Sequence, residues 1–382
     1  MPGLFEGPGP PVGLNALFLE PAHVGGTETY TRELVRALGE AAPRRRFILY
    51  LSREAGSVPW DLPPNVRISV APSRSSSRAQ RLGWELTGLV AAARRDGVGV
   101  LHSLGTTSPL WAPMARAVTV HDLIFESWPE AFPGARARVL RALVPRMLRR
   151  AERIIADSRA TADDIVERYA VNPRRLRVVQ LGPGRSPVSL PPGEAARLRA
   201  RAGVAAPYLL SVATSQPHKN LGALIAALAL ARQREPGLRL VLVGAAGTGD
   251  RALREAVAAS GLGPAVTLAG RVDDPTLDAL YEGALLFVYP SLQEGFGLPL
   301  LEAMQRGVPV LSSSAASLPE VGGDAVAYVD AARPVAIADA LVALARDPDR
   351  RASMVAAGRR RLGEFSWDRA ARETLAVYRE LL

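Results

Sequence analysis

The chain has 382 residues, 48% of them hydrophobic, and a formal net charge of +10. This length exceeds one ordinary hydrophobic core and predicts two domains, and the absence of cysteine excludes disulfides, thiolate metal sites and cysteine nucleophiles. No apolar run approaches the ~18 residues of a membrane span, and no basic-then-apolar signal opens the chain, so we expect a soluble cytoplasmic protein.

The positive charge is concentrated in the first half. Residues 1–190 contain 26 arginines against 17 acidic residues, a balance of +9, whereas residues 191–382 contain 21 basic and 20 acidic residues, a balance of +1. Only one of the 47 basic residues is a lysine, Lys219. Because lysine is a compact point charge that arginine does not replace at a tight site, Lys219 is a candidate functional residue. A nucleic-acid-binding protein would also explain the charge, but no recognised binding motif accompanies it.

Apolar runs and helical patterns alternate through the first half, as in a parallel α/β domain. The expected strands are residues 12–19, 46–51, 66–70, 98–102, 117–121, 153–156 and 176–180. The expected helices are 28–39 with Thr27 as its cap, 79–95, and one that Ser158 caps and that runs to Tyr169. Gly25 and Gly26 precede the first helix, where a glycine pair suits either an anion-contacting turn or a plain tight turn.

An arginine-rich segment, residues 134–153, carries seven arginines and one glutamate around an apolar stripe. Pro145 is expected to kink it. A basic amphipathic helix of this kind can lie on an anionic membrane surface, or it can be an ordinary solvated helix face. Both interpretations remain open.

A proline-rich stretch, residues 182–193, predicts a linker, after which the alternation restarts. The expected strands are residues 208–213, 238–243, 265–268, 285–289 and 308–311, and the expected helices are 220–234, 334–346, 349–362 and 366–382. The glycines at 244–249 do not form the G-x-G-x-x-G pattern of a dehydrogenase. We therefore predict an α/β protein of two doubly wound Rossmann-like domains, residues 1–185 and 195–365.

The most informative stretch of the chain is 285–311, where a glycine-bearing loop connects a buried strand to a short helix. Pro299 lies near the helix start and Gly307 just past its end, the usual asymmetry of proline and glycine. Backbone N–H groups of residues 297–300, together with the helix dipole, are expected to favour an anion such as a diphosphate.

Two carboxylates, Glu294 and Glu302, flank this loop and helix. Carboxylates repel phosphate but accept paired hydrogen bonds from the neighbouring hydroxyls of a ribose or a hexose. The set therefore indicates a nucleotide sugar. A simpler alternative is a helix start whose acidic residues suit its dipole.

The segment EGFGLPLLEAM, with seven residues between Glu294 and Glu302, resembles the signature of the retaining glycosyltransferases of family 4, which have the GT-B fold. The resemblance implies that Glu294 contacts the transferred sugar and Glu302 the ribose. It further implies that backbone amides between them, in the segment Gly295, Phe296, Gly297 and Leu298, hold the diphosphate.

The same resemblance assigns roles elsewhere. Lys219 would stabilise the leaving diphosphate, and Thr214 stands where many relatives have a second cation, an arginine. Backbone around Val272 would meet the nucleotide base. The loop with Gly25 and Gly26 would face the donor phosphates.

In the first half the resemblance concerns two histidines and the closing helix. His121, at the end of a strand, matches a histidine that the family places beside the transferred sugar. His102, also at a strand end, matches less clearly. Residues 366–382 would pack back onto the first domain.

The reaction that this implies is transfer of a hexosyl unit, from GDP-mannose or a UDP-sugar, to a hydroxyl of a glycan, a lipid-linked or a small-molecule acceptor. The anomeric configuration would be retained. We expect no cofactor beyond the substrate and no metal, because no Asp-x-Asp motif is present. A non-hydrolysing sugar-nucleotide epimerase, a nucleic-acid-binding protein and a catalytically silent scaffold are the competing hypotheses.

Overall fold

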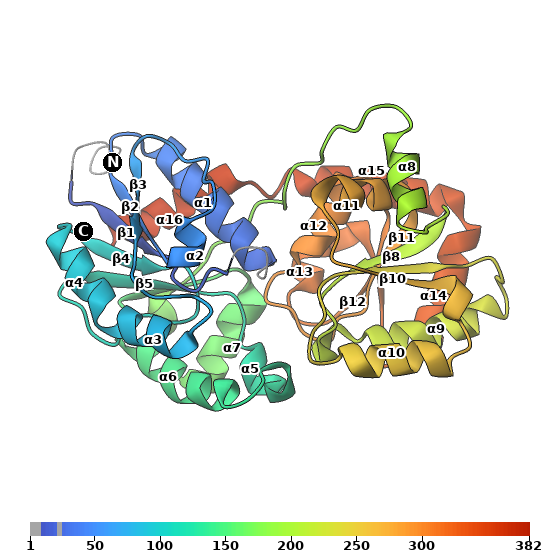
Figure 1. Ribbon diagram of the computed structural model, residues 1–382, viewed down its shortest axis with the longest axis horizontal. Helices are drawn as coiled ribbons and strands as arrows, with labels where there is room; N and C mark the ends of the chain where they lie inside the picture. Colours follow the sequence, from blue (N-terminus) through green and yellow to red (C-terminus); the bar gives the residue numbers. More distant parts are fainter. Residues whose placement is uncertain (1–8, 21–24) are drawn as a thin grey trace. The chain divides into compact units, whose positions relative to one another are not determined.

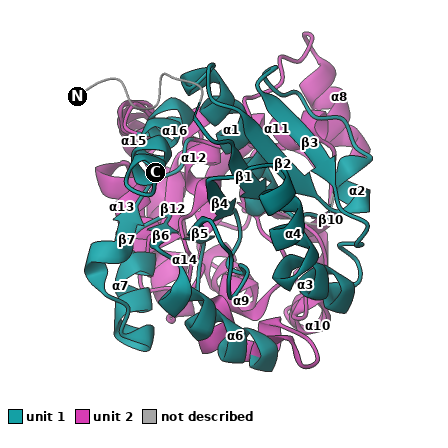
Figure 2. Ribbon diagram, turned by 90° about the vertical axis from the view of Figure 1, so that its left-hand side faces the viewer, with its two compact units in different colours: residues 1–123, 138–182, 365–382 teal, residues 124–137, 183–364 magenta. Residues whose placement is uncertain are grey.

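The computed structural model describes residues 9–20 and 25–382, which form two compact units (Figures 1 and 2). Unit 1 contains the described residues up to Leu123, Arg138–Gly182 and Phe365–Leu382. Unit 2 contains Ile124–Ala137 and Pro183–Glu364. Each unit has one sheet of parallel strands with flanking helices, so the predicted pair of doubly wound domains is confirmed.

Unit 1 has a seven-stranded sheet in the order β3-β2-β1-β4-β5-β6-β7. Its strands are β1 Val12–Asn15, β2 Phe47–Leu51, β3 Val66–Val70, β4 Val100–Ser103, β5 Ala115–Val120, β6 Arg153–Ala156 and β7 Leu176–Val178. The helices that connect or flank them are α1 Gly26–Ala41, α2 Arg53–Gly56, α3 Arg78–Leu86, α4 Gly88–Arg95, α6 Arg136–Arg150, α7 Arg159–Tyr169, η2 Pro173–Arg175 and α16 Trp367–Arg379. The central strands are buried along their whole length, as expected for a sheet covered on both faces.

The closing helix α16 packs against α1 within unit 1. Its Tyr378 is fully buried, and its hydroxyl lies 2.6 Å from Nδ1 of His102. Nε2 of His102 lies 2.8 Å from the Thr119 hydroxyl. His102 is therefore a core residue that ties the last helix to the sheet.

Unit 2 has a six-stranded sheet in the order β10-β9-β8-β11-β12-β13. Its strands are β8 Tyr208–Val212, β9 Leu240–Val243, β10 Val266–Gly270, β11 Ala284–Tyr289, β12 Val310–Ser313 and β13 Val326–Val329. Its helices are α5 Ile124–Ser127, η1 Pro129–Ala131, α8 Glu194–Arg201, η3 Pro217–Lys219, α9 Leu221–Arg232, α10 Asp250–Ala259, η4 Gly263–Ala265, α11 Asp274–Glu282, α12 Leu298–Gln305, α13 Leu318–Gly322, η5 Gly323–Ala325, α14 Pro334–Arg346 and α15 Pro348–Leu362.

Both sheets reverse their strand order once, between β1 and β4 in unit 1 and between β8 and β11 in unit 2. In an open parallel sheet, ligands bind at the carboxyl end of the strands, at the point where the order reverses. The loops that follow β8 and β11 are therefore where a site is expected in unit 2.

The structure corrects several local predictions. Thr27 lies inside α1 rather than at its cap, because Gly25 takes the cap position with no side-chain cap bond. The first strand ends at Asn15 instead of residue 19. The single helix expected over 79–95 is two helices, interrupted at Thr87. Ser158 does cap its helix, accepting a bond from the Thr161 N–H.

The chain division also differs from the predicted domain boundaries, by a few residues at the junctions and by one whole internal segment. Residues 124–137 follow β5 and were expected in the first domain, but their contacts put them in unit 2. The segment contains η1, which packs against η3. No helix among the described residues is long and apolar enough to cross a membrane.

Candidate functional site

The strongest candidate site lies in unit 2, in the loops after β8 and β11. Lys219 ends η3, directly after β8, and Glu294 lies in the loop after β11. The Lys219 ammonium donates to Glu294 Oε1 at 2.6 Å and to the Tyr289 hydroxyl at 3.0 Å. The two side chains are only 14% and 9% exposed. Two residues 75 positions apart in the sequence thus form a largely buried ion pair at the point where the strand order reverses.

Backbone hydrogen bonds hold the two loops together. The carbonyl of His218 accepts from the Leu292 N–H at 2.7 Å and from the Ser291 hydroxyl at 3.1 Å. On the other side of Lys219, the Asn220 amide donates to the Pro290 carbonyl at 3.2 Å. Lys219 is therefore positioned by both of its neighbours in the sequence.

The Glu294 loop is fixed from a third element. Ser317, just before α13, donates to the carbonyls of Glu294 at 3.0 Å and Phe296 at 2.8 Å. Such a loop keeps its geometry without a ligand, which is the preorganisation that a binding site needs.

The ion pair sets the charge of the site. Burial alone would raise the pKa of Glu294, but the charge and hydrogen bond of Lys219, together with the hydrogen bonds of Ser291 and Tyr289, hold that pKa below its usual range. Burial, the Glu294 charge and the hydrogen bond to Glu294 raise the pKa of Tyr289 well above its ordinary value. Glu294 is therefore an ionised acceptor, and Tyr289 remains neutral. An ammonium has three N–H donors, so the two bonds of Lys219 leave one for a ligand.

Glu302 has a different environment. It is half-buried in α12, and no residue in the described part of the chain donates a hydrogen bond to its carboxylate. Burial raises its pKa, and the charges of Arg306 and Arg185 oppose that rise only in part. The linker approaches it closely, since a Cβ on Gly184 would lie 2.2 Å from Glu302 Oε1.

A buried ion-pair network holds that part of the linker. Asp278 accepts from Arg306 at 2.6 Å, from Arg185 at 3.0 Å and from the Val188 N–H at 2.6 Å. The linker expected at 182–193 is thus attached to unit 2 beside Glu302.

The glycine-bearing loop begins α12 as expected, with Gly297 in a left-handed conformation at φ +107° and Pro299 in the first turn. Fewer backbone N–H groups can donate to a ligand at residues 297–300 than the four that we expected. Pro299 has no N–H, and the Leu300 N–H donates to the Gly297 carbonyl at 3.0 Å. Gly297 and Leu298 remain as the backbone donors of this helix start. Gly295 and Phe296 are buried in the same loop.

Two further expected donor contacts lie at the same edge of the sheet. Thr214 is exposed just after β8, and Val272 is half-buried just after β10. The loops between them are joined through the N–H of Gly244, which donates to the Gly270 carbonyl at 2.9 Å. The candidates of unit 2 therefore follow the carboxyl ends of three strands of one sheet, β8, β10 and β11.

Unit 1 carries a second charged pair. His121 Nδ1 lies 2.6 Å from Asp157 Oδ2, and Nε2 lies 2.9 Å from the Leu104 carbonyl. Burial lowers the pKa of His121, but the charge and hydrogen bond of Asp157, the hydrogen bond to Leu104 and the charge of Asp122 together outweigh burial and raise it. The Tyr30 ring packs edge-on against the imidazole at 4.6 Å. Both ring nitrogens are thus engaged within unit 1.

The glycine pair of unit 1 is less informative. Gly25 caps α1 through its carbonyl, which accepts from the Glu28 N–H at 3.0 Å, and Gly26 begins the helix. A Cβ at Gly25 would meet no atom of the described residues within 4 Å, so their packing does not require glycine there. Residues 21–24 of this loop lie outside the described residues.

Several neighbours of these candidates were missed from the sequence. Asp157 and Tyr289 each stand at a strand end, which is a usable signal. Trp128, by contrast, reaches unit 2 through the unexpected segment 124–137, and its ring lies 6.4 Å from that of His218. His218 is buried with Nδ1 unpaired, and burial together with Lys219 lowers its pKa to about 4.

The arrangement in unit 2 combines an ionised carboxylate, a half-buried carboxylate with raised pKa, an ammonium and a helix start. Such a set suits a ligand with both phosphate and hydroxyl groups. Within the described ranges no three His, Asp or Glu side chains converge as metal ligands.

Comparison with known families points in the same direction. Residues 198–361 match the family "Glycosyl transferases group 1", and residues 24–182 match "Glycosyltransferase Family 4". The chain is 32% identical over 274 residues to an O-antigen chain mannosyltransferase B of Escherichia coli, covering 70% of this chain and 71% of the relative. It is 34% identical to a D-inositol 3-phosphate glycosyltransferase of Salinispora tropica, over 65% of this chain but only 54% of that relative.

Solved structures share the fold at low identity. A sucrose-phosphate synthase from Thermosynechococcus elongatus superposes with a TM-score of 0.77 at 22% identity, covering 98% of this chain and 99% of the other. Anabaena HepE in complex with UDP and glucose superposes with a TM-score of 0.73 at 19% identity, covering 98% of this chain and 100% of the other.

Proposed function

The chain belongs to glycosyltransferase family 4, and we propose that it transfers a hexosyl unit from a nucleoside diphosphate sugar to an acceptor hydroxyl with retention of configuration. The donor is GDP-mannose or a UDP-sugar, and the acceptor is a glycan, a lipid-linked or a small-molecule hydroxyl. The mannosyltransferase relative supports a hexosyl donor of this kind. The observation that carries the proposal is the buried Lys219–Glu294 pair where the strand order of unit 2 reverses.

Each member of the pair has a distinct task. In the reaction the bond from the anomeric carbon to the diphosphate oxygen breaks, and the acceptor oxygen bonds to the same face of that carbon. The acceptor proton passes to the departing phosphate oxygen. The remaining N–H of Lys219 and the amides of Gly297 and Leu298 stabilise the departing charge. Ionised Glu294 accepts hydrogen bonds from the sugar hydroxyls.

Glu302 binds the nucleotide rather than the sugar. Its carboxylate is available because no described residue donates to it, and a ribose diol would supply two such donors. Gly295 and Phe296 line the diphosphate, whereas Thr214 and Val272 lie towards the nucleotide.

In unit 1, His121 is the proposed contact of the transferred sugar, and Gly25 and Gly26 face the phosphates. His121 bonds to Asp157 and Leu104 in this structure. Its Nε2 must therefore exchange the Leu104 carbonyl for a sugar hydroxyl, or its ring must contact the sugar by its face.

A donor screen followed by product analysis tests this function. We expect one of GDP-mannose, UDP-glucose or UDP-N-acetylglucosamine to raise the unfolding temperature, with and without EDTA, because the mechanism needs no metal. Proton NMR of the glycoside formed with that donor should show the donor's anomeric configuration. An inverted product, or stabilisation that EDTA abolishes, would contradict the proposal.

A sugar-nucleotide epimerase of the same fold is the second candidate, since it would use the same donor site. The two are separated by incubating the stabilising donor without acceptor. An epimerase converts the donor to its epimer, whereas the proposed transferase leaves the sugar configuration unchanged. Nucleic-acid binding is the third candidate, and only the net charge favours it.

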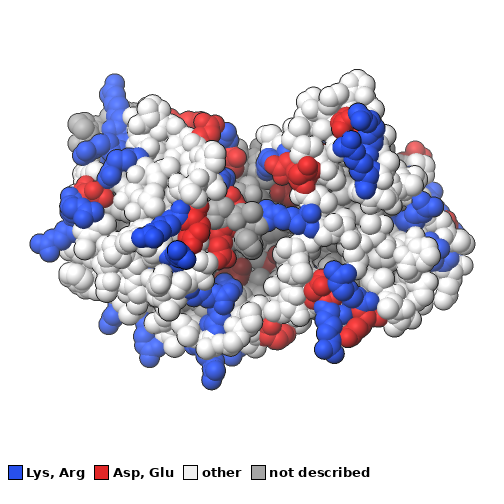
Figure 3. All heavy atoms as spheres, in the orientation of Figure 1, with Lys and Arg blue, Asp and Glu red and all other residues white. Residues whose placement is uncertain are grey.

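We also propose that unit 1 associates with an anionic membrane surface through α6. The helix carries exposed arginines, among them Arg138, Arg146 and Arg149. Figure 3 shows basic side chains along the edge that α6 occupies in Figure 1. Such a surface gains roughly 1 kcal/mol per arginine near an anionic bilayer.

A further inference from the structure

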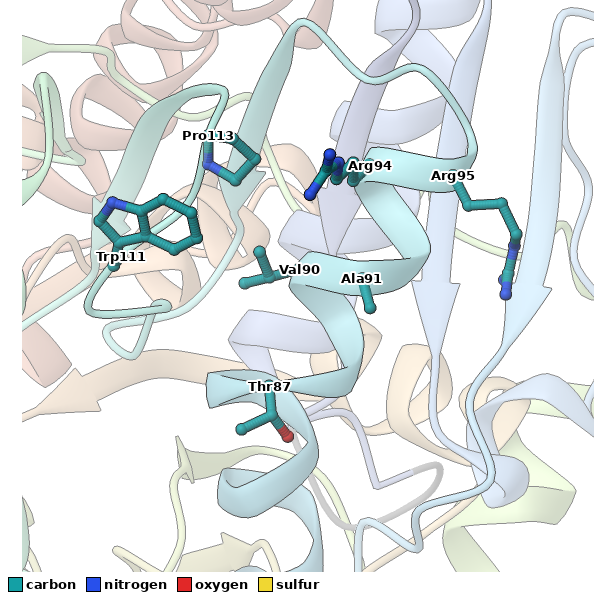
Figure 4. A pocket seen from close by; sticks show the side chains of 7 residues that line it. All are labelled: Thr87, Val90, Ala91, Arg94, Arg95, Trp111 and Pro113. Carbon is teal, nitrogen blue, oxygen red and sulfur yellow. The ribbon is translucent and has the colours of Figure 1, made fainter.

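A groove of about 520 Å³ lies on unit 1, whereas the residues of the candidate site belong to unit 2. One side comes from α4 and the other from the loop between β4 and β5 (Figure 4). The lining residues are Thr87, Val90, Ala91, Arg94, Arg95, Trp111 and Pro113.

The groove lies at the amino end of the strands. Pro113 is two residues before β5 begins, whereas His121 directly follows the end of β5. A strand of six residues spans on the order of 20 Å. A molecule in the groove is therefore too far from His121 to be the reacting group of a substrate.

Trp111 is the most unusual residue of the groove. It is 68% exposed, the largest fraction among the exposed large hydrophobic side chains of the described residues. A tryptophan has an apolar body and one N–H donor, and such residues concentrate where an apolar phase meets water.

The loop that carries Trp111 is anchored on both sides, so the exposure is not that of a loose segment. Before Trp111, the Ser108 N–H contacts the sulfur of Met147 in α6 at 3.5 Å, and Arg116 donates to the Pro109 carbonyl at 3.3 Å. After it, Met114 packs on the apolar cluster that includes residues of α4. The structure thus holds an exposed tryptophan on a loop whose other residues contact α4 and α6.

The polar groups of the groove select the ligand. Arg94 and Arg95 are exposed in the last turn of α4, and Figure 4 shows Arg94 beside Pro113, with Arg95 extending away from Trp111. The hydroxyl of Thr87 already donates to the Gly83 carbonyl at 2.8 Å. Among the described residues that line the groove there is no carboxylate and no side-chain amide, so the Thr87 oxygen is their one side-chain acceptor for sugar hydroxyls. Its composition fits an anion that is attached to an apolar body.

We propose that this groove is a membrane-docking site, in which Trp111 enters the interfacial region of an anionic bilayer and Arg94 and Arg95 pair with lipid phosphates. The proposal rests on the surface attachment proposed above and adds a second point of contact to α6. Val139 of α6 is also 41% exposed, so α6 and the groove each present an exposed apolar side chain together with arginines. The occupant is an anionic phospholipid surface rather than a soluble sugar phosphate.

Co-sedimentation of the full chain with vesicles tests the proposal. The probes are phosphatidylcholine vesicles and vesicles in which about a third of the lipid is phosphatidylglycerol. Wild type should pellet only with the anionic vesicles. Arg94→Ala should weaken that binding about fivefold, which corresponds to about 1 kcal/mol. Trp111→Ala should weaken vesicle binding about tenfold, because the variant has no indole ring to transfer from water into the bilayer interface.

Matched controls separate the groove from general charge and from catalysis. Arg350→Ala removes an exposed arginine of unit 2 and should leave vesicle binding unchanged. Trp111→Ala should keep donor binding and transfer to a soluble acceptor, so a failure of docking is distinguishable from a failure of the transferase assignment. Trp111→Phe should retain more binding than Trp111→Ala.

Three outcomes would overturn the proposal. The first is wild-type binding that neither groove variant weakens while Arg138→Ser with Arg146→Ser abolishes it, because attachment would then belong to α6 alone. The second is no binding to anionic vesicles at all. The third concerns the NMR resonance of the Trp111 indole N–H. If glycerol phosphate shifts this resonance as much as anionic vesicles do, the groove is a site for a soluble anion.

Discussion

The two units each place a basic side chain beside a carboxylate at the carboxyl edge of a parallel sheet, but not at the same position in the strand order. In unit 2, Lys219 and Glu294 follow β8 and β11, the strands on either side of the reversal. In unit 1, His121 and Asp157 follow β5 and β6, beyond the reversal. Only the pair of unit 2 occupies the position where α/β sheets bind ligands.

In unit 1 the corresponding position between β1 and β4 is occupied by buried polar side chains. Asn15 donates to Glu85 at 2.8 Å and to Ser103 at 3.1 Å, and the Thr107 hydroxyl also donates to Glu85, at 2.9 Å. These groups satisfy one another, whereas Lys219 retains a donor. We therefore propose that unit 2 performs the charge stabilisation and that unit 1 supplies a side chain whose charge can change.

Removal of the unit 2 cation should have the largest effect. Lys219→Ala should lower kcat by about a hundredfold or more, the usual loss for a group that stabilises a developing charge. Steady-state kinetics with the best donor would measure it, with Arg350→Ala as the charge-matched control in the same unit. Turnover within a few-fold of wild type would exclude Lys219 from the mechanism.

In unit 1, Asp157→Asn should act through the protonation of His121. Burial lowers the pKa of His121 and the Asp157 charge opposes it, so loss of that charge should lower the pKa. NMR titration of the imidazole would measure this, and transfer at neutral pH should fall about tenfold. An unchanged imidazole pKa would contradict the assignment of Asp157 as the charge partner.

The same shift predicts a pH dependence of stability. The pKa of His121 is higher in the folded than in the unfolded protein. Its contribution to the free energy of unfolding is therefore complete below a pH of about 6.5 and is lost as the pH rises through the folded pKa. The difference in unfolding temperature between wild type and Asp157→Asn should therefore shrink as the pH rises past the folded pKa. A difference that grows with pH would contradict this sign.

A smaller effect is expected from Trp128, which lies against His218, the neighbour of Lys219. Trp128→Ala should loosen η3 and lower kcat about fivefold. In the Trp128→Ala background, Lys219→Ala should lower kcat by a smaller factor than in wild type, because both substitutions act through the Lys219 ammonium. A double-mutant cycle on kcat would measure it. Fully additive losses would show that Trp128 does not position Lys219.

The fold was predictable because strands and helices alternate with clear turn signals, whereas the local errors have local causes. Thr27 was a plausible N-cap because of its side chain, but Gly25 takes the N-cap position of α1. Glycine has no side chain that could indicate this position in the sequence. The break at Thr87, where φ is −129°, divides a helical pattern that is continuous in the sequence.

The candidate site was predictable residue by residue but not as a unit. Glu294 and Glu302 stand out by their spacing, and Lys219 by being the only lysine. Their pairing was not visible, because the contact between Lys219 and Glu294 depends on β8 and β11 being neighbours in the sheet. Trp128 was missed for a similar reason, since segment 124–137 follows a strand of unit 1 yet packs in unit 2.

The central claim is that unit 2 divides its two glutamates between nucleotide and sugar, and calorimetric titration with the nucleoside diphosphate of the best donor tests it most directly. Glu302→Ala should weaken binding about tenfold through loss of the ribose contact. Gly184→Ala should do nearly the same, because its Cβ would displace the Glu302 carboxylate. Glu294→Ala should bind the nucleoside diphosphate within about twofold of wild type, yet fail in transfer. Equal weakening by Glu302→Ala and Glu294→Ala, or wild-type affinity in Glu302→Ala, would contradict the account.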